Sequence, residues 1–178
     1  MNINDIKKTI TIVHDYPIPG IIFRDITTLL EDPNAFKATV DIMVDKVSGL
    51  EFDRVVGIES RGFFWSAPIA YALSKPFVLA RKPGKLPRRT VSKEFILEYG
   101  TNSVHIHADA IKEGEKILIV DDLIATGGTA EAAAKLIEKS GGEVAGFVFV
   151  INLFDLGGKD LLEKKGYKCF SFLDFPGH

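Results

Sequence analysis

Two adjacent carboxylates, Asp121 and Asp122, stand just before a run of small residues, Ala125 to Thr129, with the sequence A-T-G-G-T. Glycine lets the backbone approach a bound anion without a clash at Cβ, and threonine hydroxyls can donate hydrogen bonds to it. Carboxylates repel phosphate, so we expect the acidic pair to face another part of the ligand, either sugar hydroxyls or a bridging metal ion. A ligand with a phosphate at one end and a diol at the other is a ribose 5-phosphate.

The segments on either side of these residues predict a strand and a helix. Ile117 to Val120 is a continuous apolar run, typical of a strand buried on both faces in a parallel sheet. The alanine-rich segment from Ala130 to Lys139 predicts a helix that ends at Gly141 and Gly142. A strand that leads through a glycine-rich turn into a helix forms an anion site, because unpaired N–H groups and the helix dipole meet there.

Within the turn, Gly127 and Gly128 are expected to bring the backbone close to the phosphate, and either Thr126 or Thr129 could cap the helix. The glycines are not followed by the Gly-Lys-Ser/Thr of a Walker motif, and they do not fit G-x-G-x-x-G. The motif is therefore neither a P-loop nor a dinucleotide fingerprint.

A second predicted strand, Val55 to Ile58, also ends in polar groups. It precedes Glu59, Ser60, Arg61 and Gly62, and strand ends of this kind are where α/β folds bind ligands. We interpret Arg61 as an anion-binding residue; a surface salt bridge is the alternative interpretation.

A third predicted strand, Phe77 to Ala80, leads into five cations within the nine residues from Arg81 to Arg89. At a strand end, Arg81, Lys82 and Lys85 favour contact with a polyphosphate. The last two cations of the run fit either such a contact or a solvated charged face.

The alternation of strands and helices predicts an α/β fold with a twisted parallel sheet flanked by helices. Helices are also predicted at 2–14, 33–48 and 63–73, the last buried on nearly every face, and strands at 144–153 and, at an edge, 167–173. Residues 90–108 are polar and irregular and are expected to form a lid, in which 94–99 and 103–107 could pair as a loose hairpin. Because parallel strands end at one edge, the ligand groups should converge there.

The composition is that of an ordinary globular protein of 178 residues, with 46% hydrophobic and 26% charged residues, and this length suits one domain. A net charge of −2 and a pI of about 6.1 provide no basic field for nucleic acid. The apolar stretches are too short to span a membrane, and the N-terminus lacks a signal-peptide pattern. The single cysteine, Cys169, favours a reducing cytoplasm.

The stretch from Lys116 to Glu131 resembles the phosphoribosyl diphosphate (PRPP) binding motif of the type I phosphoribosyltransferases. Further segments resemble the adenine phosphoribosyltransferases of that family, in order along the chain: F-R-D-I-T (23–27), R-K-P-G-K-L-P (81–87), L-E-Y-G (97–100), I-N-L-F-D-L-G-G (151–158) and F-P-G-H (175–178). The resemblance implies one phosphoribosyltransferase domain over 1–178, with an N-terminal helix and base-binding segment at 1–32 and a flexible lid loop at 88–107.

The resemblance implies a purine-salvage reaction that transfers the 5-phosphoribosyl group from PRPP to adenine and gives AMP and diphosphate. Glu98, as acid or base on the lid, and Arg61 would be catalytic. The phosphoribosyl group would bind to Asp121, Asp122, Ala125, Thr126, Gly127, Gly128 and Thr129. The diphosphate would bind to Glu59, Ser60, Arg61, Gly62, Arg81, Lys82 and Lys85. Adenine would bind to Ile22, Phe23, Arg24 and Leu153.

The same resemblance implies Mg²⁺ as the cofactor, held mainly by the substrate near Asp121 and Asp122, with no direct protein ligand assigned. It implies a homodimer, and a cis peptide bond between Glu59 and Ser60. The expected partners are adenine and PRPP, without nucleic acid or membrane.

Three alternatives stay open. A relative that acts on 6-oxopurines would need a lysine near the base, which cannot be placed in this sequence. A non-catalytic PRPP sensor would be expected to add a nucleic-acid-binding surface, which the charge and length disfavour. For Phe23, simple core packing is as good an interpretation as contact with the base.

Overall fold

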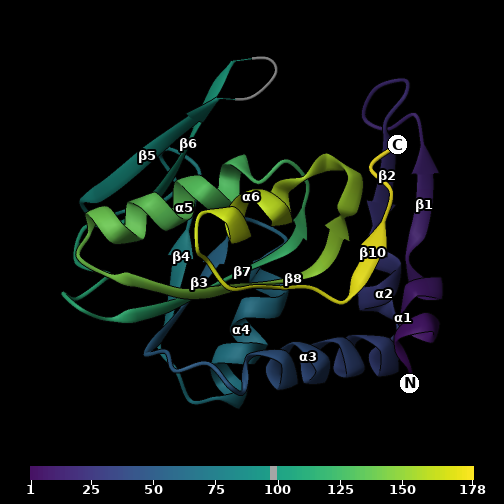
Figure 1. Ribbon diagram of the computed structural model, residues 1–178, viewed down its shortest axis with the longest axis horizontal. Coiled ribbons are helices and arrows are strands. Elements are labelled where there is room, and N and C mark those ends of the chain that lie inside the picture. The colour runs from purple at the N-terminus through teal and green to yellow at the C-terminus, as the bar shows by residue number, and fades with distance from the viewer. Residues whose placement is uncertain (97–99) are drawn as a thin grey trace.

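The computed structural model describes residues 1–96 and 100–178. Its central sheet has the strand order β10-β8-β7-β3-β4, with every neighbouring pair parallel, and β9 pairs with β8 off this path (Figure 1). The strands are β3 (Arg54–Ile58), β4 (Phe77–Ala80), β7 (Lys116–Ile124), β8 (Glu143–Leu153), β9 (Cys169–Phe170) and β10 (Leu173–Phe175). The predicted parallel α/β sheet is confirmed, while the single edge strand predicted at 167–173 is instead two short strands.

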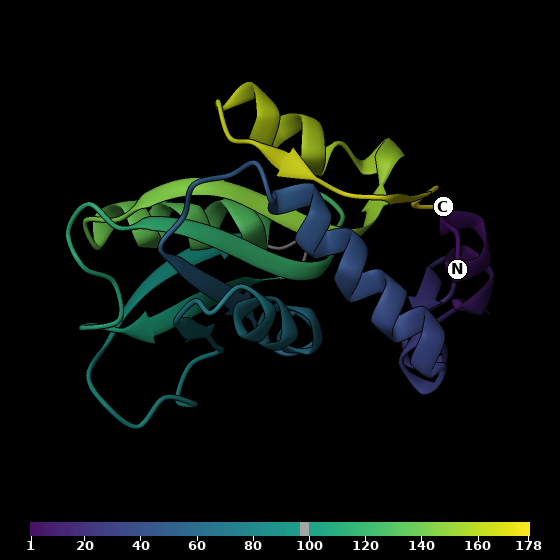
Figure 2. The ribbon, with the colours of Figure 1, turned by 90° about the horizontal axis from the view of Figure 1, so that it is seen from below.

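Helices cover both faces of the sheet, because side chains of successive strand residues point to opposite faces. On one face α3 (Pro33–Val47) and α4 (Phe63–Ala72) enclose a core that includes Leu118 and Val120. On the other, α5 (Gly128–Lys139) and α6 (Gly158–Lys164) enclose a core that includes Ile117 and Ile119. Figure 2 shows α3 running from the sheet toward the N-terminal region.

The N-terminal region differs from the predicted helix over 2–14. Helix α1 (Ile3–Thr9) is followed by strand β1 (Thr11–His14), which pairs antiparallel with β2 (Ile22–Asp25) before α2 (Thr27–Glu31). The helix prediction is wrong beyond Thr9. Thr11-Ile12-Val13 are β-branched residues that favour extended backbone, and the hydrogen bonds to β2 hold them there.

Helix α4 is less buried than its apolar sequence predicts. Trp65 and Ile69 are fully buried, whereas Phe64 is 42% exposed and Tyr71 is 89% exposed. The helix therefore carries apolar side chains on a face that the described part of the chain leaves uncovered.

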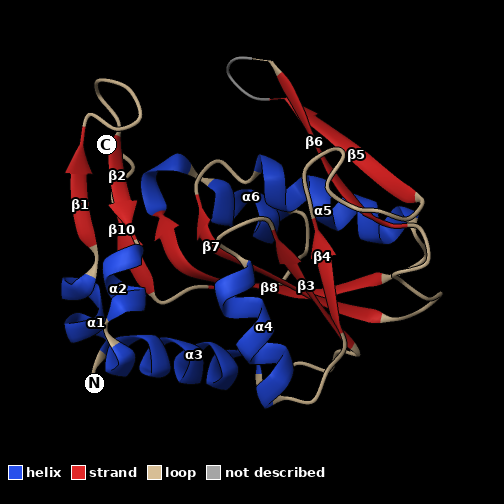
Figure 3. Ribbon diagram, turned by 180° about the vertical axis from the view of Figure 1, so that it is seen from behind, coloured by secondary structure: helices blue, strands red, loops and turns tan. Residues whose placement is uncertain are grey.

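The lid region is more regular than expected. β5 (Thr90–Ile96) and β6 (Thr101–His107) form an antiparallel hairpin that projects beyond the sheet (Figure 3). Pairing runs from Thr90↔His107 to Ile96↔Thr101, so the irregular interpretation of this region is wrong. A hairpin does form, but 103–107 pairs with 90–94 instead of with the predicted 94–99. Residues 97–99 lie outside the described part of the chain. None of the described helices is long and apolar enough to cross a membrane.

Candidate active site

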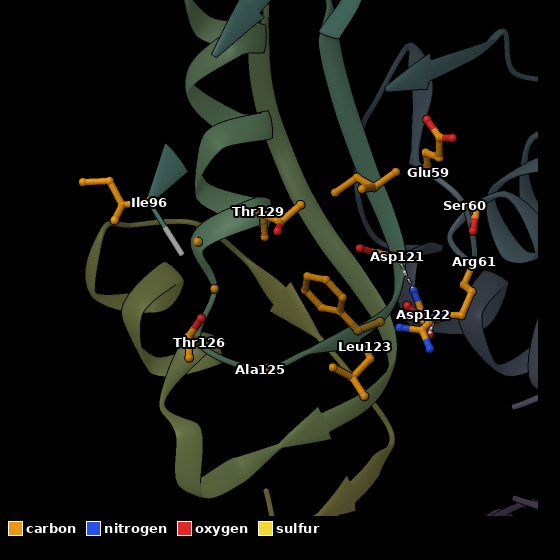
Figure 4. Close-up of a pocket in the computed structure, with 15 residues that line it drawn as sticks. Glu59, Ser60, Arg61, Ile96, Asp121, Asp122, Leu123, Ala125, Thr126 and Thr129 are labelled. Atoms are coloured by element: carbon orange, nitrogen blue, oxygen red, sulfur yellow. Dashed lines mark hydrogen bonds and ion pairs between the residues drawn. The ribbon is translucent and has the colours of Figure 1, made fainter. Parts of the chain in front are cut away.

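A cavity of about 720 Å³ opens at the carboxyl ends of β3 and β7 and at the N-terminus of α5 (Figure 4). The expected convergence of two of the three strand ends is therefore observed. The cavity is lined by Ile58, Glu59, Ser60, Arg61, Ile96, Asp121, Asp122, Leu123, Ala125, Thr126, Gly127, Gly128, Thr129, Ala130 and Phe149.

The acidic pair lies within β7, which continues to Ile124 instead of ending at Val120. Asp122 is 3% exposed, and its Oδ2 lies 3.0 Å from Nε of Arg61. Asp121 Oδ1 accepts a hydrogen bond of 2.8 Å from the backbone N–H of Asp122. The guanidinium carbon of Arg61 also lies 5.3 Å from the centre of the Phe23 ring. Arg61 thus links the acidic pair to the segment expected to bind the base.

Burial governs the titration of both carboxyls. Loss of solvent raises the pKa of Asp121 well above its usual value, and the neighbouring charge of Asp122 raises it further. Burial also raises the pKa of Asp122, although the positive charge of Arg61 opposes this shift. Two adjacent acids with raised pKa values beside an arginine are typical of a functional site.

The turn from Ala125 to Gly128 has the geometry of an anion-binding turn. Gly127 is the residue before the first turn of α5, has φ of +88°, and no side chain caps the helix there. The prediction that Thr126 or Thr129 caps α5 is therefore wrong. Because no side chain caps α5, the backbone N–H groups of its first turn can serve a bound anion.

Gly62 sits where the β3 turn approaches β7 most closely. A Cβ at this position would lie 2.4 Å from the carbonyl oxygen of Ile58 and 3.0 Å from Oδ1 of Asp121. Only glycine fits between the turn and the acidic strand. The peptide bond between Glu59 and Ser60 is cis, as expected.

Glu59 and Arg81 interact with each other beside the cavity. Arg81 Nη2 lies 3.2 Å from Glu59 Oε1, and the N–H of Lys82 donates to Glu59 Oε2 at 2.8 Å. Burial by itself would raise the pKa of Glu59, but these donors hold it below its usual value. Arg81 and Lys82 line a smaller cavity of about 150 Å³ next to the main one, and Lys85 is exposed.

None of the four residues expected to bind adenine lines this cavity; three lie on β2 and the fourth ends β8. Phe23 of β2 shares a neighbouring hollow of about 410 Å³ with Arg61. Ile22 is half-buried, and Leu153, at the end of β8, is 8% exposed. Arg24 is 4% exposed, and its guanidinium turns to the C-terminal segment, where it donates to the carbonyl of Pro176.

Sequence reasoning missed several cavity residues. Leu123, Ile96 and Phe149 line the main cavity, and Tyr16 packs edge-on against Phe23 with ring centres 5.1 Å apart. The strand alternation after the acidic pair was a signal that could have identified Leu123, whereas Phe149 lies on β8 and is placed there only by the sheet. Glu98 lies outside the described residues.

Comparison with known proteins agrees with this geometry. Residues 25–177 match the family described as phosphoribosyl transferase domain. The sequence is 54% identical to the adenine phosphoribosyltransferase of Escherichia coli O157:H7 over 173 residues, which cover 97% of this chain and 94% of that protein.

Solved structures of similar proteins share the whole fold. The adenine phosphoribosyltransferase of Thermoanaerobacter pseudethanolicus superposes with a TM-score of 0.94 at 45% identity, over 98% of this chain and 100% of that chain. The APRTase of Giardia lamblia, complexed with 9-deazaadenine, gives a TM-score of 0.92 at 30% identity over 98% of each chain. The chain therefore belongs to the adenine phosphoribosyltransferases, within the phosphoribosyltransferase family.

Proposed function

We propose that this site transfers the 5-phosphoribosyl group of PRPP to N9 of adenine, giving AMP and diphosphate in purine salvage. The observation that carries the proposal is the cavity in which the Asp121–Asp122 pair, the Ala125–Thr129 turn and Arg61 face one another. These groups match the diol, the 5-phosphate and the diphosphate of one substrate. The similarity to curated adenine phosphoribosyltransferases supports adenine as the acceptor.

The chemistry follows from charge. Breaking the bond at the anomeric carbon builds positive charge on the sugar and negative charge on the leaving diphosphate, so the site must stabilise both. Asp121 and Asp122 bind the ribose hydroxyls and place negative charge near the sugar. Arg61 and the backbone of the Glu59–Gly62 turn bind the diphosphate.

Mg²⁺ is the proposed cofactor, and when bound it neutralises charge on the diphosphate. Among residues 1–96 and 100–178, no group of three or more His, Cys, Asp or Glu side chains could hold a metal ion. The proposed ion is held mainly by the substrate, near Asp121 and Asp122. Asp121 and Asp122 are the acidic side chains that would lie near that ion, and Asp122 Oδ2 already lies 3.0 Å from Nε of Arg61.

The base and the lid complete the proposal. Ile22, Phe23 and Leu153 enclose the adenine ring, and backbone groups at Arg24 read its edge. Glu98, on the 88–107 lid, exchanges a proton with the ring as N9 attacks. Closure of the lid excludes water that would hydrolyse the activated sugar.

The protein is proposed to act as a homodimer in the cytoplasm. Support for the dimer is the apolar face of α4, where Phe64 and Tyr71 are exposed. Support for the cytoplasm is that the only cysteine, Cys169, is buried and free.

The test is AMP formation from adenine, PRPP and Mg²⁺, with hypoxanthine, guanine and xanthine in parallel reactions. Turnover with adenine alone supports the proposal. Turnover with a 6-oxopurine in place of adenine would reassign the acceptor. Tight PRPP binding without turnover on any base would make the protein a PRPP sensor.

A further inference from the structure

The β1–β2 hairpin, which carries Phe23 and Arg24, forms a sheet of its own and makes no strand pairing with the main sheet. Leu153, the other residue proposed to contact the base, belongs to the main sheet. The distance between these two groups is therefore not set by backbone pairing. Some other contact must fix it if the base is to be held between them.

Among the described residues, two side-chain hydrogen bonds join residues 1–31 to the rest of the chain, and both end on the C-terminal segment. Lys7 Nζ donates to the carbonyl of Asp174 at 2.5 Å, and Arg24 Nη2 donates to the carbonyl of Pro176. The C-terminal segment lies beside β2 in Figure 1. It thus ties the hairpin to the main sheet.

Arg24 is built into this junction and does not reach into the cavity. Its Nη1 donates to the carbonyl of Ile22 at 2.5 Å, within its own strand, while Nη2 reaches across to Pro176. The guanidinium carbon lies 5.4 Å from the centre of the Phe175 ring, which is 5% exposed. The planar Arg24 guanidinium therefore donates hydrogen bonds both to the backbone of the base-binding segment and to the backbone of the C-terminal segment.

The C-terminal segment is in turn fixed to the strand that carries Leu153. Phe175 is paired with Leu153 in the parallel register of β10 and β8. Gly177 donates its N–H to Asp155 Oδ1 at 2.5 Å, and a Cβ on Gly177 would lie 2.5 Å from Cγ of Leu156. The segment Phe175–Gly177 is packed tightly on the end of β8.

We propose that the C-terminal segment Phe175–Gly177, through the Arg24 guanidinium, positions the β2 base-binding segment opposite Leu153 and so sets the affinity for adenine. The side chain of Arg24 is thus proposed to position β2. This role is distinct from any contact that the Arg24 backbone makes with the base. This inference rests on the proposed function, because it takes the base to lie between β2 and Leu153.

The test uses Arg24→Met, which removes both donors and keeps a long side chain, and a chain shortened by Pro176, Gly177 and His178. The matched control is Arg54→Met, which removes a comparable partly buried guanidinium that bonds Glu115 at 3.0 and 2.7 Å, away from the cavity residues. KM and kcat are measured for adenine and for PRPP, with hydrogen–deuterium exchange of residues 11–25 as a readout independent of turnover.

Both altered chains are expected to raise KM for adenine by about tenfold and to leave KM for PRPP within about twofold. Amide exchange in residues 11–25 should quicken, whereas Arg54→Met should lower the melting temperature without either effect. Unchanged exchange, or faster exchange with an unchanged adenine KM, would overturn the inference. If the wild-type enzyme makes no AMP from adenine, the proposed function is refuted. The positioning role is tested separately: unchanged amide exchange of residues 11–25 in the two altered chains would refute it whatever the activity.

Discussion

Arg61 Nε lies 3.0 Å from Oδ2 of Asp122, a carboxyl whose side chain is 5% exposed, and this ion pair joins the β3 turn to the acidic strand β7. The same guanidinium lies over the ring of Phe23, so one side chain contacts the proposed ribose and base regions together. The pair defines how charge is arranged in the site before substrate binds. Its removal should be felt in catalysis more than in folding, because Arg61 is 40% exposed and solvent screens part of its charge.

Arg61→Met should lower kcat/KM for PRPP by about 100-fold, because the diphosphate loses a cation and Asp122 loses its counter-ion. Arg61→Lys should recover part of this loss, since it restores charge without the planar guanidinium. Steady-state kinetics with varied PRPP measures both. Lys37→Met, which removes an exposed pair with Asp41 on α3, is the control and should leave the rate unchanged. Equal rates for wild type and Arg61→Met would remove Arg61 from the diphosphate site.

The raised pKa of Asp121 predicts a stability that falls as pH rises. A carboxyl whose folded pKa lies above its unfolded value of about 3.9 holds its proton longer when folded, so the folded state binds more protons between the two pKa values. Unfolding free energy therefore decreases as pH increases through that window. At a pH near the unfolded pKa, Asp121→Asn should have about the same melting temperature as the wild type. As the pH rises, its melting temperature should exceed that of the wild type by a growing margin. The variant should also lose activity. Calorimetry across pH checks this; a constant difference would contradict it.

Gly62→Ala should nearly abolish activity, because a methyl group would overlap the Ile58 carbonyl and press on Asp121. A displacement of about 1 Å in such a site can lower the rate by about 100-fold. The comparison is Gly49→Ala, where no atom lies within 4 Å of the added Cβ and the backbone is not left-handed. Kinetics and melting temperature are measured on both. Full activity in Gly62→Ala would show that the turn can move away from β7 without consequence.

Glu98→Gln tests the proposed proton transfer on the lid. Loss of a general acid or base should reduce kcat by about 100-fold while KM for PRPP changes little, because the substitution keeps the shape of the side chain. Glu94→Gln, which replaces an exposed glutamate on β5, should leave kcat unchanged. Rapid-quench measurement of the first turnover separates the chemical step from product release. If both variants turn over at the wild-type rate, Glu98 has no role in the chemistry.

The exposed face of α4 predicts the dimer surface. Tyr71→Glu should convert the homodimer to a monomer at micromolar concentration, because a buried unpaired charge would oppose association. Phe154→Glu, which also replaces an exposed aromatic residue but away from α4, should remain dimeric. Sedimentation velocity distinguishes these species. A dimeric Tyr71→Glu protein would move the interface off this face, and a monomeric wild type would end the dimer proposal.

The sequence by itself predicted four strands of the main sheet, β3, β4, β7 and β8, together with the acidic pair, the A-T-G-G-T turn and the polar residues that follow these strands. These features are local: continuous apolar runs predict buried parallel strands, and the polar residues after them must then gather at one edge. The family resemblance supplied adenine, Glu98 and the cis bond, which no local pattern would have provided.

The tertiary structure alone decided the features that depend on distant partners. Thr11–His14 became a strand because β2 was available to pair with it, against its helical periodicity. The Arg24 side chain bonds the C-terminal segment because that segment, more than 150 residues away in sequence, returns beside β2. Arg81 turned to Glu59 because β3 and β4 are neighbours in the sheet. Each choice depends on contacts between residues far apart in the chain, whose energies a local pattern does not contain.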